Sequence, residues 1–199
     1  MTRFNPLATS PKFFAAAALF ACAVLGAGSA NATLIGVSEI RVTSGYTGAD
    51  SYIQLSEIIA RQTGTGTDVA LNGTATSSGN YSDQSSPSKA VDGLFTDLSY
   101  PNMYHSSGTT GAFFDVVFTG GPASIDSVTL YGRSDCCSFR DIYNLQFFGV
   151  SHNLLLAVNG IDATNSTHSA TVTVPEPTSL ALLGLGLLGF AASRRKSAK

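Results

Sequence analysis

The strongest restriction on the fold comes from a series of short segments that are apolar or that alternate between apolar and polar residues. Six such segments, each of seven to nine residues, occupy positions 35–43, 51–59, 112–118, 124–132, 143–150 and 168–174. Segments rich in Gly, Ser, Thr and Asn separate them, as is typical of turns and loops. No apolar stripe at helical spacing continues for three turns between residues 33 and 173. The pattern predicts an all-β protein, a β-sandwich whose long loops are the favoured place for binding residues.

The first 32 residues have the composition of a secretory signal peptide. A basic start precedes the apolar run of residues 13–28, and the small-x-small sequence of residues 30–32 predicts cleavage after Ala32. An N-terminal core helix is the alternative, but polar sequence rich in Gly and Thr follows directly. Lipid attachment at Cys22 is a further alternative, disfavoured because Phe20 is bulky and the apolar run continues past the cysteine.

Residues 174–199 form a tail of three parts: Pro175-Glu176-Pro177, an apolar run at 180–192, and the basic cluster of residues 194–196. The run has 13 residues, whereas a stable bilayer span needs about 20. The basic cluster should stay on the cytoplasmic side. This tail closely resembles the PEP-CTERM sorting signal of Gram-negative bacteria. The resemblance implies export to the cell envelope or extracellular matrix, transient membrane anchoring by residues 180–192, and cleavage near Pro-Glu-Pro by an exosortase. Such a tail directs sorting of the protein and does not contribute to the fold.

Between residues 33 and 173 the chain is acidic and holds few cations. Five Lys or Arg side chains stand against twelve Asp or Glu, a net charge near −7. Binding to nucleic acid needs a basic surface, so this balance argues against nucleic acid as a partner. Two of the five cations, Arg133 and Arg140, nevertheless lie close together in the stretch YGRSDCCSFRD. A pair of surface charges is usually only solvated, but these two flank the double cysteine.

That stretch sets Cys136 and Cys137 side by side. Once Cys22 leaves with the signal peptide they are the only cysteines of the exported domain, and an oxidising compartment favours a disulfide between them. Adjacent Cα atoms are ~3.8 Å apart, shorter than the usual disulfide range of about 4.4–6.8 Å, so the bond fixes a tight turn. A redox switch is an open alternative, since strained disulfides reduce more easily. A metal site on the two thiolates is disfavoured because no other cysteine exists.

Four stretches follow one another in an order typical of one family: AVDG (90–93), HSSG (105–108), FFD (113–115) and SIDSVTLYGRSDCCSFR (124–140). With them the chain resembles the F-type lectins, or fucolectins, which are relatives of the discoidin modules. The fucose-binding motif of that family is a His, a gap, Arg-x-Asp, four residues, and Arg or Lys. This chain has His105, 27 intervening residues, Arg133-Ser134-Asp135, four residues and Arg140. The gap is one residue longer than usual. The resemblance implies a jelly-roll β-sandwich of the galactose-binding-domain-like type, flanked by the signal peptide and the sorting helix.

The matching segments occur in an altered order. Residues 66–78 look like the opening strand and loop of the family, and the hairpin of residues 38–58 before them looks like the strands that normally close the domain. That order suggests a circular permutation, which is physically cheap because chain termini often lie close together. Residues 154–174 would then supply the final strand.

The resemblance assigns roles in a sugar site. Arg133 and Arg140 would present rigid forks of donors, and His105 would add a donor or acceptor. Asp135 would orient an arginine rather than act as an acid. The bridge between Cys136 and Cys137 would pack its sulfurs against C–H groups of the sugar.

The family also binds a structural cation, usually calcium, through carbonyl and carboxylate oxygens. The matching ligands are the carbonyls of Lys89, Leu94 and Ser56, the carboxylates of Asp92 and Glu57, and Asn102. Glu57 has this role only if the permutation holds. Without the resemblance, Asp92 before Gly93 is an ordinary turn residue.

Two departures from the family pattern affect the rim and the core. Phe113 and Phe114 stand where the family usually has tryptophan, and we expect them in the core. The loop between Asp92 and His105 differs from the usual one, so Tyr100 and Tyr104 are candidate rim residues that would equally suit packing.

Three functions compete. An exported lectin that recognises fucose or a related sugar on glycans or exopolysaccharide is favoured. A glycosidase would need two carboxylates about 5–10 Å apart across a cleft, and none is distinguished by context, so we expect no enzyme. A structural protein of the matrix or cell surface is the alternative. A single shallow site binds weakly, which would favour an oligomer.

Overall fold

Strands form where the sequence alternates between buried and more exposed side chains. The computed structural model describes residues 33–174 and contains three short 3-10 helices, η2 (Asp83–Ser85), η3 (Pro87–Val91) and η4 (Ser138–Arg140). Its strands are β1 (Leu34–Val37), β2 (Glu39–Ser44), β3 (Gln54–Leu55), β4 (Glu57–Gln62), β5 (Thr74–Ser77), β6 (Tyr104–His105), β7 (Phe113–Val117), β8 (Ala123–Tyr131), β9 (Ile142–Phe148), β10 (Leu154–Asp162) and β11 (Ser169–Thr173). The predicted all-β class is therefore confirmed.

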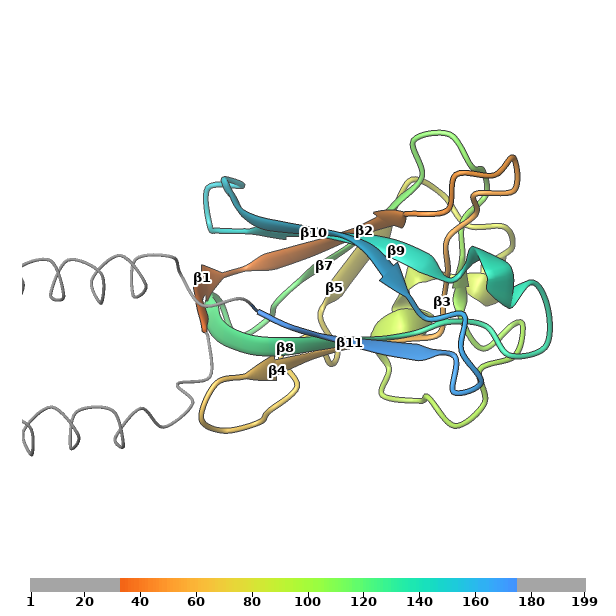
Figure 1. Cartoon of the computed structure of the whole chain (residues 1–199). Helices are drawn as coiled ribbons and strands as arrows, with labels where there is room; N and C mark the ends of the chain where they lie inside the picture. Colours follow the sequence, from red (N-terminus) through yellow and green to blue (C-terminus); the bar gives the residue numbers. More distant parts are fainter. Residues whose placement is uncertain (1–32, 175–199) are drawn as a thin grey trace, which may run out of the picture. The chain divides into compact units, whose positions relative to one another are not determined.

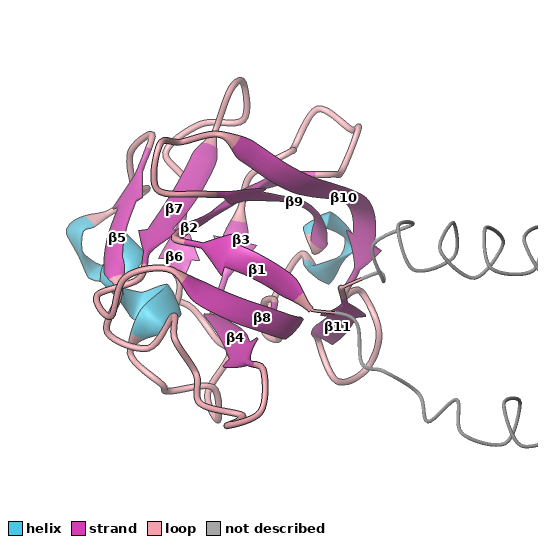
Figure 2. Cartoon of the chain, turned by 90° about the vertical axis from the view of Figure 1, so that its left-hand side faces the viewer, coloured by secondary structure: helices cyan, strands magenta, loops and turns pink. Residues whose placement is uncertain are grey.

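The strands form two main antiparallel sheets that lie one above the other in Figure 1. In the first, β8 pairs with β1, β4 and β11. The second has the order β10-β9-β2-β7-β5, and a small third sheet pairs β3 with β6. Figure 2 shows the same two layers from the side. Because strand side chains alternate between faces, each sheet turns one apolar set inward.

The hydrophobic core fills the space between these layers. Its largest side chains, all at most 1% exposed, are Tyr104, Tyr143, Phe114, Phe147, Ile40, Ile53, Leu55, Ile58, Met103, Ile125, Leu130 and Leu145. They come from both main sheets and from the small one. Phe114 thus lies in the core as expected, whereas Phe113 is half-buried on the outer face of its sheet.

Two predicted strands are each interrupted by a serine. Residues 35–43 divide at Ser38, whose main-chain N donates to the Phe148 carbonyl, so β1 joins one sheet and β2 the other. Residues 51–59 divide at Ser56, whose main-chain N donates to the Tyr131 carbonyl. The prediction of a hairpin at residues 38–58 is wrong, because β2 and β4 lie in different sheets.

The predicted signal peptide (residues 1–32) and the tail beyond Val174 lie outside the described residues. Between residues 33 and 174, no helix has the length and apolar character needed to cross a membrane.

Candidate functional site

Strand β8 separates the two ends of the domain. Leu34 pairs with Ile125 and Thr173 pairs with Ser127, so the chain enters the described domain beside the first half of β8 and leaves it beside the middle of that strand. Strand β8 has 9 residues, a length of roughly 26 Å at about 3.3 Å per residue. Arg133 follows its other end. The loops beyond β8 gather there, at the right of Figure 1, far from residues 34 and 173.

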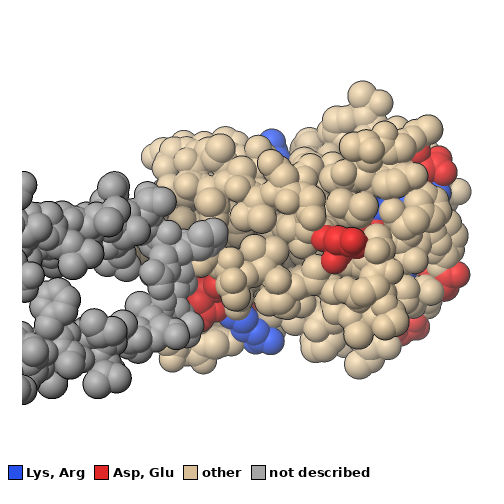
Figure 3. Space-filling model, in the orientation of Figure 1, with Lys and Arg blue, Asp and Glu red and all other residues tan. Residues whose placement is uncertain are grey.

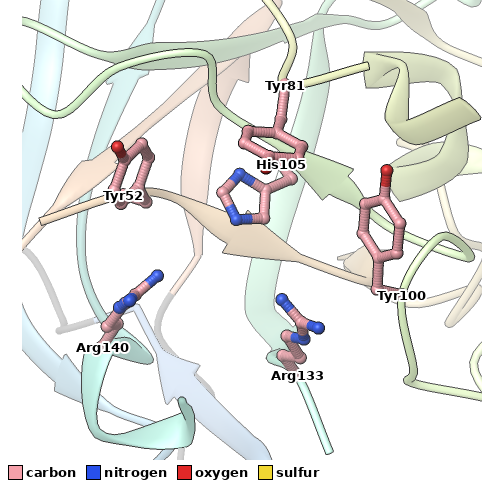
Figure 4. A pocket seen from close by; sticks show the side chains of 6 residues that line it. All are labelled: Tyr52, Tyr81, Tyr100, His105, Arg133 and Arg140. Atoms are coloured by element: carbon pink, nitrogen blue, oxygen red, sulfur yellow. The ribbon is translucent and has the colours of Figure 1, made fainter. Parts of the chain in front are cut away.

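A pocket of about 410 Å³ lies at this end, lined by Tyr52, Tyr81, Tyr100, His105, Arg133 and Arg140 (Figure 4). Strand pairing brings these separate stretches together. Gln54 of β3 pairs with His105 of β6, which places Tyr52 beside the histidine. The main-chain N of Tyr81 donates to the His105 carbonyl at 2.8 Å.

The side chain of Arg133 is fixed by a two-pronged ion pair with Asp135. Its Nε donates to Oδ1 at 2.7 Å and its Nη2 to Oδ2 at 2.9 Å. These bonds raise the pKa of Arg133 and lower the pKa of Asp135, so both groups stay charged. Among residues 33–174, Nη1 has no partner. Asp135 thus braces the arginine as the resemblance implies, and a planar donor group remains for a ligand.

Aromatic rings hold Arg140. Its guanidinium carbon lies 5.3 Å from the ring centroids of both Tyr52 and Phe139. Its Nη2 donates to Oδ2 of Asp50 at 3.2 Å. The arginine side chain is 13% exposed and that of Asp50 58%, so the rings and not the carboxylate fix the guanidinium. In Figure 4 both guanidinium groups point toward His105.

His105 is buried, with 6% of its surface exposed. Its Nδ1 lies 2.9 Å from the Ser106 carbonyl oxygen, which can only accept, so Nδ1 carries the proton. Burial lowers the pKa of His105, and the charges of Arg133 and Arg140 lower it further. The ring is therefore neutral at pH 7, and its other nitrogen, Nε2, is an acceptor. Figure 4 shows this nitrogen directed toward the space between the two arginines.

Three tyrosine rings wall the pocket around His105, with centroids 5.3 Å (Tyr52), 4.9 Å (Tyr81) and 6.5 Å (Tyr100) from its own. Tyr100 could be predicted as a rim residue from the sequence, but Tyr52 and Tyr81 could not. No spacing signal marks these two residues, and only the strand pairing around β6 brings them into the pocket. Tyr104, the other candidate, packs in the core instead, and its hydroxyl donates to the Gly79 and Phe113 carbonyls.

The predicted disulfide between Cys136 and Cys137 is present, in the loop that joins the two arginines. Cys137 has a left-handed backbone with φ of 61°, and its carbonyl accepts from the main-chain N of Arg140 at 3.1 Å. The turn thereby starts η4, which carries Arg140. Neither cysteine is among the six lining residues.

Asp141 fixes the main chain at the start of the same loop. Its Oδ2 accepts from the main-chain N of Arg133 at 2.8 Å, and Oδ1 lies 3.3 Å from the hydroxyl of Tyr143. The carboxyl group is fully buried, and burial raises its pKa to about 7. The resemblance did not point to this residue, because it lies just after the motif.

The proposed calcium ligands fall into two groups. Glu57 is fully buried, its Oε2 accepts from the main-chain N of Gly93 at 3.1 Å, and Oε1 has no partner among residues 33–174. Burial raises its pKa to about 8, and the neighbouring charge of Asp92 adds to this. An unpaired buried carboxylate oxygen beside a second carboxylate fits a hard cation. Within the described residues, however, no three His, Cys, Asp or Glu side chains form a metal cluster.

The remaining predicted ligands are engaged elsewhere or contribute only main-chain oxygens. Asn102 donates through Nδ2 to Oδ2 of Asp97 at 2.9 Å. Ser56 is expected to offer its carbonyl, and its hydroxyl donates to the Gly132 carbonyl at 2.7 Å. Lys89 and Leu94 are expected to offer carbonyls, and they flank Asp92 in sequence. Glu57 and Asp92 are thus the carboxylates available to such an ion.

Comparison with known proteins identifies the tail. Residues 173–196 match the family model described as the PEP-CTERM protein-sorting motif. This match confirms the predicted sorting signal and indicates an exported, sorted protein of the Gram-negative cell envelope. No curated protein and no solved structure matches the chain.

Proposed function

We propose that the domain is a lectin that binds fucose, or a related sugar of a glycan or exopolysaccharide, in the pocket of His105, Arg133 and Arg140. The observation that carries the proposal is the convergence of two oriented guanidinium groups and one neutral imidazole on a single space walled by tyrosines. The proposal includes the jelly-roll form of the β-sandwich that the resemblance implies.

The pocket supplies both kinds of contact that a sugar needs. Sugar hydroxyls are well solvated, so a site must replace water with directional bonds on a preorganised surface. The two arginines donate to hydroxyl or ring oxygens, and Nε2 of His105 accepts from a hydroxyl. The rings of Tyr52, Tyr81 and Tyr100 face C–H groups and a methyl group. On the face of the domain that Figure 3 shows, charged side chains are few and scattered.

The pocket lining favours binding over hydrolysis. A glycosidase works with two carboxylates across the scissile bond, and the six lining residues include none. Asp135 is committed to Arg133. In this proposal the sulfurs of Cys136 and Cys137 form a platform at the edge of the sugar.

Titration of the exported domain tests the proposal. Calorimetry with L-fucose should give a dissociation constant between about 10 μM and a few mM, with L-galactose binding more weakly because it has a hydroxymethyl group where fucose has its methyl group. If no fucosylated or other glycan binds, the lectin proposal fails and the structural role in the matrix is favoured.

Acidification should weaken binding through His105. The pKa of His105 is lowered below its ordinary value, so the acceptor Nε2 persists at pH 7 and is lost when the ring gains a proton at lower pH. We expect a constant affinity for fucose from pH 7 to 8 and a decrease below about pH 6. Calorimetry across pH measures it. His105→Gln should bind weakly with no such decrease, and His152→Gln, at an exposed histidine, should behave as wild type. An unchanged profile in His105→Gln would contradict this role.

We further propose that Glu57 and Asp92 hold a structural calcium ion, with carbonyl oxygens of Lys89, Leu94 and Ser56 completing the shell. When bound, the ion would compensate the buried charge of Glu57. Without it, ionisation of Glu57 opposes folding, since its pKa is about 8 in the folded protein and 4.5 in a solvated chain.

The sign of the pH dependence follows from that difference. Between about pH 4.5 and 8 the folded state binds more protons at Glu57 than the unfolded state, so the free energy of unfolding falls as pH rises. In EDTA, the melting temperature should therefore fall over this range, less steeply in Glu57→Gln. Asp141 accounts for the remaining slope up to about pH 7. At pH 8, calcium should raise the melting temperature of the wild type and not of Glu57→Gln. Equal calcium responses would exclude the site.

A further inference from the structure

A second hollow, of about 300 Å³, lies on the outer face of the five-stranded sheet. The side chains used in the argument are Arg41, Thr43, Tyr46, Ser51, Phe113 and Gln146. They come from strands β2, β7 and β9 and from the loop after β2. Because Ile40 and Val42 point into the core, their neighbours Arg41 and Thr43 point outward.

The strand register places these groups next to one another. Arg41 stands opposite Gln146 on one side and Asp115 on the other, and Thr43 stands opposite Phe113. Directly opposed residues of antiparallel strands have Cβ atoms about 4.5–5.5 Å apart. The sheet therefore forms the floor of the hollow, and loop residues complete its walls.

Arg41 repeats the arrangement that holds Arg133 in the first pocket. Its Nε donates to Oδ1 of Asp115 and its Nη2 to Oδ2, both at 2.7 Å. Its guanidinium carbon lies 4.6 Å from the Phe113 ring centroid, as Arg133 lies 5.5 Å from that of Tyr100. Again Nη1 has no partner among the described residues. The same braced fork beside an aromatic ring thus occurs twice.

The other polar groups of the hollow also have hydrogen-bonding capacity left over. Among residues 33–174, the side chains of Thr43, Ser51 and Gln146 have no protein partner, and all three are partly exposed. Together with Arg41 they offer donors and acceptors beside the rings of Phe113 and Tyr46. This composition suits a neutral ligand rich in hydroxyl groups.

The two pockets border each other. Ser51 of the hollow precedes Tyr52 of the first pocket in the chain. The Tyr46 ring meets the Phe139 ring edge-on, with centroids 5.5 Å apart, and Phe139 in turn lies 5.3 Å from the guanidinium carbon of Arg140. Phe139 is 48% exposed. A ridge of two aromatic rings therefore separates the pockets, a surface on which sugar C–H faces pack well.

We propose that this hollow is a subsite for a second sugar residue of the same glycan, which crosses the ridge of Tyr46 and Phe139. The inference rests on the proposed lectin function and adds that the ligand is an oligosaccharide, not a single terminal sugar. The subsite should raise the affinity for a glycan of suitable length by about tenfold over that for L-fucose alone.

Calorimetry with L-fucose and with fucose-terminated di-, tri- and tetrasaccharides tests the subsite. At least one oligosaccharide should bind about tenfold more tightly than fucose. Gln146→Ala and Thr43→Val should each remove most of that gain and leave the affinity for fucose unchanged. Arg41 is kept, because its loss would leave the buried Asp115 without its ion-pair partner. Thr74→Val, on the same outer face but outside the hollow, is the matched control and should retain the full gain.

The outcomes separate the two proposals. If fucose binds but no oligosaccharide binds more tightly, or if the gain survives both variants, the subsite is wrong and the lectin proposal stands. If neither fucose nor any oligosaccharide binds, both fail. A change in the side-chain amide resonances of Gln146 on adding oligosaccharide, and not on adding fucose, would locate the second sugar directly.

Discussion

Replacing Arg140 by methionine should lower the affinity for L-fucose by about a hundredfold or more. Hydrogen bonds to a charged group contribute about 1.5–3 kcal/mol each, and about 1.4 kcal/mol corresponds to tenfold. Loss of two such bonds therefore gives the expected factor. Methionine keeps much of the apolar stem that packs on Tyr52 and Phe139, so the fold should persist. Asp50, which forms an ion pair with Arg140, is largely exposed and would simply be solvated.

Calorimetry measures the loss, and thermal unfolding shows whether the variant remains folded. Arg140→Lys should retain part of the affinity, since the ammonium group keeps the charge and the motif allows Lys at this position, although it is no planar fork. Arg61→Met is the matched control, because Arg61 is exposed, pairs with Ser127 at the middle of β8 and is not among the residues that line the pocket. If Arg140→Met binds fucose as the wild type does, the pocket is not the sugar site.

Replacing Gly132 by alanine should damage both the fold and the site. A Cβ at this position would overlap the carboxylate of Asp141, which is buried and holds the main-chain N of Arg133. The glycine has no room to shift. Its N donates to the His168 carbonyl, and its own carbonyl accepts from the Ser56 hydroxyl, both at 2.7 Å. Forcing a methyl group into a packed site costs about 1–3 kcal/mol, and loss of the Asp141 bond adds to this.

The melting temperature of Gly132→Ala should therefore fall by about 5–10 °C, and fucose affinity should fall with it because the Arg133 main chain moves. Differential scanning calorimetry gives the first quantity and sugar titration the second. Gly120→Ala is the control, since a Cβ at Gly120 meets nothing within 4 Å. Wild-type stability in Gly132→Ala would show that Asp141 is not held as described.

Much of the fold could be predicted because a strand with one buried and one exposed face alternates between apolar and polar residues. Strands β7, β8, β9 and β11 appear where the sequence places them. The apolar pattern does not reveal β5, because its residues, TATS, are small and polar, although the resemblance places a strand within residues 66–78; it does not reveal β6 because that strand has only two residues. The interruptions at Ser38 and Ser56 depend on carbonyls of Phe148 and Tyr131 that are distant in sequence. Local pattern carries no information about such partners.

The candidate site could be predicted only in part, for a related reason. Arg133, Asp135 and Arg140 lie within one stretch whose spacing is informative. His105 lies with them despite the longer gap, since the β3–β6 pairing sets its position. Tyr52 and Tyr81 reach the pocket only through that pairing. The role of Asp141 in fixing the main chain of Arg133 could not be predicted from the sequence, because it depends on the burial of the carboxyl group.

The described domain begins beside the first half of β8 and ends beside the middle of that strand, and the pocket lies beyond the strand's far end. In a copy retained through its tail, the segment of β8 from Ser127 to Tyr131 would separate the exit of the chain from the pocket loops by about 13 Å, at about 3.3 Å per strand residue. Neighbouring copies on one surface would then offer several sites, without any contact between domains. For a ligand that repeats along a polymer, the second binding event becomes intramolecular, and avidity can exceed the affinity of one site by about a hundredfold or more. A weak pocket would be sufficient for firm adhesion between cell and polymer.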